Sequence, residues 1–522
     1  MRRFLLLCLL VLAPMAAQAD EATDAIAGAN FDDIRRGVEA LGVSGNPKAS
    51  AILGAMQDGK LFVRADKTLF IKTDDGGYLD AQTGKPATDV GNVRAIRVNN
   101  AIRRSVDAAL GALRLFDPAA SVRATAADAV FKSRDPAGLP ALERAIAAEK
   151  DSGVKRTIQQ ARASALFAAG NASEADRLAA VATLRDRGDI DARALLSTLG
   201  DQPKSVNDAA AAAVKSIDVS LQIWSVLQSV FYGLSLGSVL LLAATGLAIT
   251  FGVMGVINMA HGEMVMIGAY TTFVVQEVIR GYAPGLFGAS LFIAVPLAFL
   301  VSGGIGIGIE RSLIRWLYGR PLETLLATWG LSLVLQQAVR SIFGPSNREV
   351  GTPAWMSGAW QIGGLSLTYN RLTIIVFAVL VVAALMATLR YTSLGLRMRA
   401  VTQNRRMASA MGIRTPWVDA LTFGLGSGVA GIAGVALSQI DNVSPNLGQG
   451  YIIDSFMVVV FGGVGNLWGT ALAALTLGIL NKFLEPVAGA VLAKIFVLIA
   501  LILFIQRRPR GMFPQKGRAV EA

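Results

Sequence analysis

Two residue types that often carry chemistry are almost absent from this sequence. Among its 522 residues there is one cysteine, Cys8, and one histidine, His261. A disulfide within the chain needs two cysteines, and zinc sites draw their ligands mainly from cysteine and histidine. The composition excludes an internal disulfide and argues against a zinc enzyme. We expect no catalytic residue, no metal site and no cofactor in this chain.

Charged residues are also scarce. They make up 16% of the chain, against 53% hydrophobic residues, and the mean hydropathy is +0.50. This balance is too apolar for a soluble enzyme of this length and indicates a protein that crosses a membrane several times. The net charge of +12 fits basic loops on one side of a membrane better than a nucleic-acid surface, so we expect no nucleic-acid partner.

The first residues have the pattern of a signal peptide. Arg2 and Arg3 precede an apolar stretch over residues 4–12, and small residues lead to a cleavage site after Ala19. We expect residues 1–19 to be removed, Cys8 with them, and the chain after Asp20 to lie outside the cytoplasm. An uncleaved anchor is the alternative.

Residues 20–218 are Ala-rich and charged, with apolar positions every three or four residues. Asp-Pro pairs at 117–118 and 135–136 mark helix starts. The spacing is similar to a HEAT-type α-solenoid, and residues 59–84 predict a small β-hairpin inserted between helices. We expect a periplasmic helical-repeat domain, which either presents a binding face or serves as a rigid cap.

Residues 219–522 read as a bundle of about eight or nine transmembrane segments, including broken helices. The run 452–484 is too long for one span, and "GGVGNLWG" (462–469) interrupts it, which predicts two short segments. Gly304 with Gly308, and Gly424 with Gly428, predict packing seams between helices. The apolar runs are 225–250, 262–279, 286–309, 324–343, 371–389, 418–440, 452–484 and 487–506.

Basic residues gather in three stretches that predict the orientation. Arginines crowd residues 390–414, and further basic residues lie at 311–320 and 507–518. The positive-inside rule places all three stretches, and therefore the C-terminus, in the cytoplasm. Only 16 residues follow Gln506, so a receptor with a cytoplasmic output domain is disfavoured.

Polar side chains inside apolar runs predict a translocation path. Thr324, Thr328, Ser332 and Gln336 are spaced by four and form a slowly winding stripe on a helix. The stripe lines a lumen, or it ties neighbouring helices together.

The stretch "GVINMAHGEMVMIGAY" (255–270) carries Asn258, His261 and Glu263. These side chains do not share one helix face, which predicts a bend with Gly262 providing the freedom. We place all three in the path; a proton-relaying His–Glu pair is the alternative.

The longest basic stretch lies within residues 392–416 and predicts a short amphipathic helix. It would insert Met398, Val401, Met407 and Met411 into a partner groove. Its basic rim would be Arg397, Arg399, Arg405 and Arg406. A helix lying on anionic membrane lipid is the alternative. Because no G-x-x-x-x-G-K-[ST] motif occurs, ATP would be hydrolysed by a partner.

Four stretches carry a family resemblance: 255–270, "YGRPLETLLATWGLSLVLQQAVRSIFG" (318–344), "SLGLRMRAVTQNRRMASAMGI" (393–413) and "FMVVVFGGVGNLWGTALAALTLG" (456–478). In this order they resemble the membrane subunit of bacterial ABC importers of the branched-chain amino acid permease family. The resemblance covers about residues 221–515. It implies an inner-membrane permease with a second homologous permease subunit, two ATPase subunits and a periplasmic substrate-binding protein. It also implies that residues 392–414 contain the helix that meets an ATPase.

The N-terminal extension and residues 481–513 resemble the urea-importing branch of this family. The resemblance therefore implies urea as the substrate. Branched-chain amino acids or short amides are the alternative within the same machine, because a polar path suits each of them. A proton-coupled carrier that uses His261 and Glu263 is the alternative of a different class.

Overall fold

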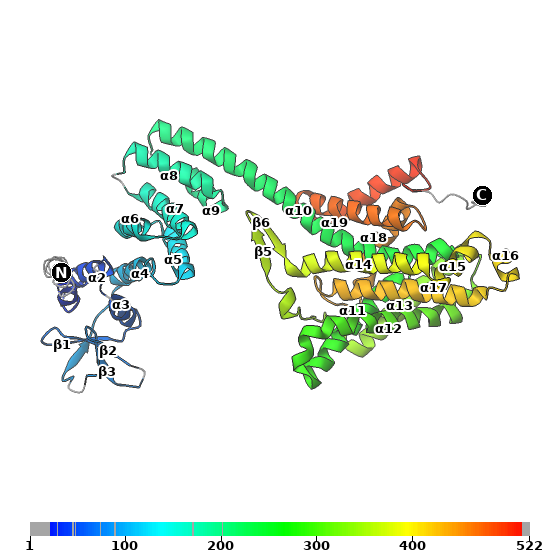
Figure 1. Cartoon of the computed structure of the whole chain (residues 1–522), viewed down its shortest axis with the longest axis horizontal. Helices are drawn as coiled ribbons and strands as arrows, with labels where there is room; N and C mark the ends of the chain where they lie inside the picture. Colours follow the sequence, from blue (N-terminus) through cyan, green and yellow to red (C-terminus); the bar gives the residue numbers. More distant parts are fainter. Residues whose placement is uncertain are drawn as a thin grey trace, which may run out of the picture. The chain divides into compact units, whose positions relative to one another are not determined.

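The computed structural model describes residues 21–513 except 29, 44–45, 47, 74, 88–89, 170–171 and 201. The signal peptide expected at 1–19 lies outside the described residues. The chain forms two compact units, the first ending at Gln222 and the second beginning at Ile223, and each is described by itself (Figure 1).

The first unit begins with helices around a small antiparallel sheet. Its strand order is β3-β2-β1-β4, and Leu61 and Val63 of β1 turn inward at alternate positions, the pattern of a half-buried strand. The predicted hairpin is therefore confirmed, within a larger sheet. The elements are α2 (Phe31–Val43), α3 (Ala49–Gln57), β1 (Leu61–Arg64), β2 (Leu69–Lys72), β3 (Tyr78–Asp80), β4 (Val93–Ala95) and α4 (Asn100–Arg114).

The rest of the first unit is helical. Asp135 caps the short helix η1, its side chain accepting from the Ala137 amide, and Asp151 caps α7 in the same way. Arg123 and Glu149 form a nearly buried ion pair between neighbouring segments. The elements are α5 (Ala120–Ser133), η1 (Pro136–Gly138), α6 (Leu139–Ala148), α7 (Ser152–Ala168), α8 (Glu174–Arg187) and α9 (Ile190–Ser197).

The second unit is a helical bundle with one exposed hairpin, β5 (Ala359–Ile362) and β6 (Leu365–Thr368). Its helices are α10 (Lys204–Met254), which begins in the first unit, α11 (His261–Tyr282), α12 (Ser290–Ser312), α13 (Pro321–Phe343), α14 (Tyr369–Tyr391), α15 (Ser393–Gln403), α16 (Arg405–Ala410), α17 (Thr415–Leu437), α18 (Leu447–Gly462) and α19 (Leu467–Arg507). Short 3₁₀ turns are η2 (Pro284–Ala289), η3 (Ile314–Trp316) and η4 (Ala354–Met356).

Five helical segments of the described chain are long and apolar enough to cross a membrane. They are α10, the stretch Pro284–Trp316 around α12, α14, α17 and α19. α11 and α13 have 22 and 23 residues but carry the polar side chains described below, and α18 is shorter and apolar. Length and composition therefore support five spans, fewer than the eight or nine predicted.

The predicted break at 462–469 is confirmed. α18 ends at Gly462, and Gly463 has a φ of 103°, which a residue with a side chain rarely adopts. The side chain of Asn466 then caps α19 by accepting from the amides of Trp468 and Gly469, each at 3.1 Å. Two separate helices therefore replace the single long apolar run.

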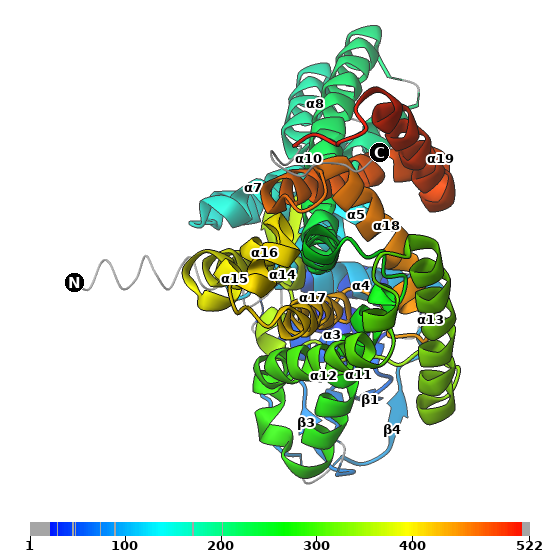
Figure 2. The same cartoon turned by 90° about the vertical axis from the view of Figure 1, so that its right-hand side faces the viewer.

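Helices α11, α12 and α17 pack against one another in the second unit (Figure 2). A Cβ added at Gly268 would lie 2.0 Å from the Gly431 carbonyl oxygen, and a Cβ at Gly424 would meet Ile307 at 2.6 Å. Glycine therefore allows backbones to touch here. The predicted seam on α12 is wrong, since Gly304 and Gly308 face open space, while Gly303 and Gly306 make the contacts.

Candidate functional site

The chain breaks between α10 and α11, as predicted. Gly255 takes a φ of 68°, and residues 255–258 lie outside any helix. Asn258 stabilises the turn because its side-chain oxygen accepts from the Ala260 amide at 3.0 Å. The backbone conformation that the bend needs is provided by Gly255. Gly262, which was predicted to provide it, lies in the first turn of α11. At Gly262 a Cβ would approach the Gly448 carbonyl oxygen to 2.4 Å, so its role is close packing.

His261 fastens the start of α11 to α10. Its side chain is buried, and Nε2 lies 2.9 Å from the Ala243 carbonyl oxygen. A carbonyl only accepts hydrogen bonds, so this contact requires the imidazole proton to be on Nε2. No hydrogen bond joins His261 to Glu263 among the described contacts, so the two do not form the predicted alternative of a relay pair here.

Glu263 instead meets α13. Its Oε1 accepts hydrogen bonds from Ser332 Oγ and Gln336 Nε2, both at 2.8 Å, and Gln336 also donates to Ser332 Oγ at 3.2 Å. We call these three residues the carboxylate cluster. All of its side chains are buried. The structure therefore brings together two regions, 255–270 and 324–343, that sequence inspection had identified separately.

The N-terminal part of the polar stripe on α13 contacts the break between α10 and α11. Thr328 Oγ1 accepts from the Met259 amide at 3.1 Å, while Thr324 donates to the carbonyl of Arg320 at 2.8 Å. Thr324, Thr328, Ser332 and Gln336 are the buried residues of α13. The stripe thus faces the protein interior. Thr324 and Thr328 bond to the backbone, whereas Ser332 and Gln336 donate to the Glu263 carboxylate.

One oxygen of the carboxylate cluster is left without a partner. Glu263 Oε2 is buried and makes no hydrogen bond within the described chain, and no described cation pairs with this carboxylate. A buried acceptor without a donor costs free energy, about 1–3 kcal/mol and more when it is charged. The arrangement can accept N–H or O–H donors from a molecule that reaches it. No cluster of metal-ligating side chains occurs among the residues that the structure describes.

The stretch 392–416 forms two short helices where one was predicted. Asn404 separates α15 from α16 and caps the latter, its side chain accepting from the Met407 amide at 2.9 Å. Met398 and Val401 pack into this chain's own core, 3% and 4% exposed, so the prediction that they enter a partner groove is wrong. Met407 and Met411 remain exposed, at 60% and 77%.

The arginines of this stretch have different environments. Arg397 and Arg406 are exposed. Arg399 donates to the carbonyl of Leu389 at the end of α14, and Arg405 forms an ion pair with Asp419 of α17. Only part of the predicted basic rim is therefore free of internal contacts.

Arg405 belongs to a group of charged side chains that sequence inspection missed. We call Glu310, Tyr318, Arg405 and Asp419 the ion cluster. Tyr318 donates its hydroxyl to Glu310 Oε1 at 2.9 Å, and the Arg405 guanidinium lies 4.9 Å from the centre of the Tyr318 ring. Burial raises the pKa of Tyr318, so its phenol stays protonated and keeps donating. Glu310 and Asp419 are 1% and 0% exposed.

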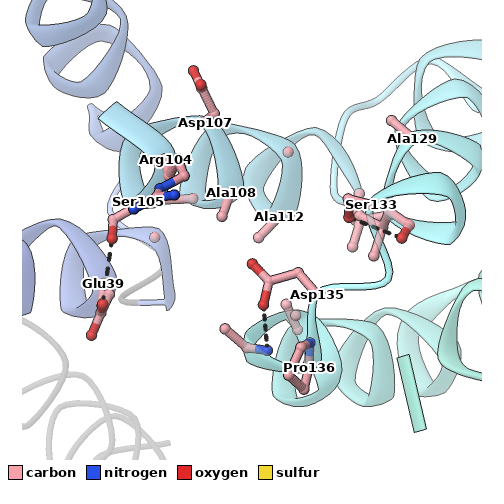
Figure 3. A pocket seen from close by; sticks show the side chains of 18 of the residues that line it. Glu39, Arg104, Ser105, Asp107, Ala108, Ala112, Ala129, Ser133, Asp135 and Pro136 are labelled. Carbon is pink, nitrogen blue, oxygen red and sulfur yellow. Dashed lines mark hydrogen bonds between the residues drawn. The ribbon is translucent and has the colours of Figure 1, made fainter. Parts of the chain in front are cut away.

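The first unit contains a groove of about 740 Å³ between α2, α4 and the region of α5 and η1. Its floor is alanine-rich and its rim is charged. Figure 3 shows the Asp135 carboxylate near Ala112, with one oxygen bound to the Ala137 amide at 2.9 Å. The charged rim residues are Glu39, Arg104, Asp107, Arg134 and Asp135.

Comparisons with known proteins concern the second unit. The family model described as branched-chain amino acid transport system / permease component matches residues 229–505. The permease protein LivH of the high-affinity branched-chain amino acid transport system of Escherichia coli is 32% identical over 296 residues, 55% of this chain and 94% of the relative. The corresponding BraD protein of Pseudomonas aeruginosa is 30% identical over 298 residues, 56% and 96%.

No solved structure matches the chain. The family model covers more than half of the 522 residues and falls within the helical bundle that holds both clusters. Such a permease component is a non-enzymatic, multi-pass membrane subunit of an ABC transporter. The chain belongs to the family of branched-chain amino acid transport system permease components.

Proposed function

We propose that this chain forms the translocation path for urea in an ATP-driven importer of the bacterial inner membrane. The observation that carries the proposal is the carboxylate cluster, a buried set of hydrogen-bonding groups within a bundle of apolar helices. Polar and ionisable groups are rare inside membrane proteins, where they mark substrate pathways. Glu263, Ser332 and Gln336 would contact the substrate, while Asn258, His261, Thr324 and Thr328 would hold the walls of the path.

Urea suits this site chemically. It is small and neutral, and its N–H groups can be bound by the free Glu263 Oε2, while the side-chain amide and hydroxyl of Gln336 and Ser332 add hydrogen-bonding capacity. The first unit lies outside the stretch that the family model matches, so this chain differs from the curated relatives by an added N-terminal part. Branched-chain amino acids, named in the titles of those relatives' systems, are the second candidate substrate.

The surrounding assembly follows from this function. After a signal peptide at 1–19, residues 20–218 form a HEAT-like periplasmic domain, and residues 219–522 form the membrane bundle and end in the cytoplasm. A second homologous permease subunit, two ATPase subunits and a periplasmic binding protein complete the importer. The exposed Met407 and Met411 with Arg397 and Arg406 form the surface that meets an ATPase.

The test is uptake of radiolabelled urea into proteoliposomes that hold this chain and the four partner polypeptides. We expect uptake that requires both ATP and the binding protein and is unaffected by excess leucine. Inhibition by leucine would assign the path to amino acids. Uptake without ATP would contradict the importer and favour a carrier that uses His261 and Glu263.

A further inference from the structure

The ion cluster joins α16 to two helices of the bundle, α12 and α17. α16 has a single buried residue, Ala408, so apolar packing holds it only weakly. Its first residue, Arg405, donates from both terminal nitrogens to the two oxygens of Asp419 near the start of α17. Two hydrogen bonds fix the orientation of the guanidinium relative to the carboxylate as well as the distance between them.

Breaking this contact would leave Asp419 with a buried charge. The Asp419 carboxylate is fully buried, while Arg405 is 43% exposed at its side chain. Removing one member of a buried ion pair is far more costly than replacing both, because the remaining charge has lost water and partner together. A displacement of α16 is therefore less costly when the start of α17 moves with it.

The same guanidinium is linked to α12 through Tyr318, which lies between η3 and α13. Arg405 lies over the Tyr318 ring, and Tyr318 in turn donates to Glu310 near the end of α12. Beside them, Arg311 of α12 lies 4.2 Å from the centre of the Trp417 ring of α17. α12 and α17 pack along their length at glycine contacts. Arg405 engages α17 directly through Asp419 and α12 through Tyr318 and Glu310.

We propose that the ion cluster transmits movement of α16 to α12 and α17, with Arg405 as its positioning residue. The inference rests on the proposed function, in which α16 meets an ATPase subunit, and it adds the route from that contact into the bundle. Loss of the cluster would then separate ATP hydrolysis from transport without preventing assembly.

The experiment measures ATP hydrolysis and uptake in the same proteoliposomes, with urea and leucine each tested as the transported probe. Arg405→Gln and Asp419→Asn are expected to lower the number of molecules taken up per ATP at least fivefold and to abolish stimulation by the binding protein. Arg405→Lys restores part of both. Arg320→Gln is the matched control, because Arg320 pairs with Glu323 at an exposed site outside the cluster.

A double variant, Arg405→Gln with Asp419→Asn, guards against misfolding because it leaves no charge of this pair buried alone. We expect it to assemble and melt like the wild type and still to hydrolyse ATP unproductively. A wild-type ratio of uptake to hydrolysis in the double variant, or in either single variant, would overturn the inference. A wild-type assembly that neither hydrolyses ATP nor takes up either probe would instead contradict the proposed function.

Discussion

At the scale of single residues, three polar side chains close in sequence have three different tasks. Asn258 holds a turn, His261 fastens two helices, and Glu263 alone reaches across to α13. Their positions in an apolar stretch identified the region in advance. Their partners could not be predicted, because the Ala243 carbonyl and the Ser332 hydroxyl become neighbours only when α10, α11 and α13 pack.

Replacing Glu263 by Gln tests the role of the carboxylate. The amide has nearly the same size but loses the charge, and hydrogen bonds to charged groups contribute about 1.5–3 kcal/mol. We expect the urea concentration for half-maximal uptake to rise about 10- to 100-fold, with assembly intact. Uptake kinetics over a range of urea concentrations measure this.

The control is Glu277→Gln on the same helix, where the side chain is 52% exposed and pairs with Arg280. It should leave uptake unchanged. If Glu263→Gln transports urea with wild-type kinetics, the carboxylate is not part of the path.

At the scale of helices, glycine decides which backbones touch. The break between α18 and α19 could be predicted because several glycines interrupt an apolar run. The division of 392–416 into α15 and α16 could not, because it depends on Asn404 capping a new helix, and no glycine or proline occurs at residues 396–411 to mark the boundary. The side of α12 that packs was also misassigned, since Gly303, Gly304, Gly306 and Gly308 look equivalent in sequence.

Alanine substitutions at two glycines should separate packed from open positions. At Gly268 the new Cβ would collide with the Gly431 carbonyl oxygen, and overpacking of this kind costs about 1–3 kcal/mol. We expect Gly268→Ala to lower the melting temperature of the purified chain by several degrees or to prevent its accumulation.

Gly304→Ala is the matched comparison on α12, where a Cβ meets nothing within 4 Å. Its melting temperature should equal that of the wild type or exceed it slightly, because alanine favours a helix by up to about 1 kcal/mol over glycine. An equal decrease in melting temperature in the two variants would contradict the inference that Gly268 is needed for the close approach of α11 and α17.

At the scale of the whole molecule, the family match and the added N-terminal unit pose separate questions. Composition and basic loops predicted a membrane bundle preceded by a water-soluble part, and the chain forms two compact units. The groove of the first unit could not be predicted from sequence, because its lining residues come from α2, α4 and the region of α5 and η1.

We propose that the first unit helps dock the substrate-loaded binding protein or gate the outer mouth. Deleting residues 20–215 should then lower receptor-dependent uptake at least tenfold while ATP hydrolysis without receptor persists. Uptake assays over a range of receptor concentrations measure this, and a loss that excess receptor overcomes would indicate docking rather than gating. Receptor-dependent uptake at the wild-type level by the shortened chain would contradict both docking and gating by the first unit.

The contact between His261 and Ala243 also makes a spectroscopic probe of the joint between α10 and α11. Since the chain has one histidine, isotope labelling of that amino acid produces a single imidazole signal in a nuclear magnetic resonance spectrum. The proton on Nε2 points at the Ala243 carbonyl, so its chemical shift depends on the length of that bond. Spectra recorded with nucleotide or substrate present would report directly whether the two helices stay joined as the transporter turns over.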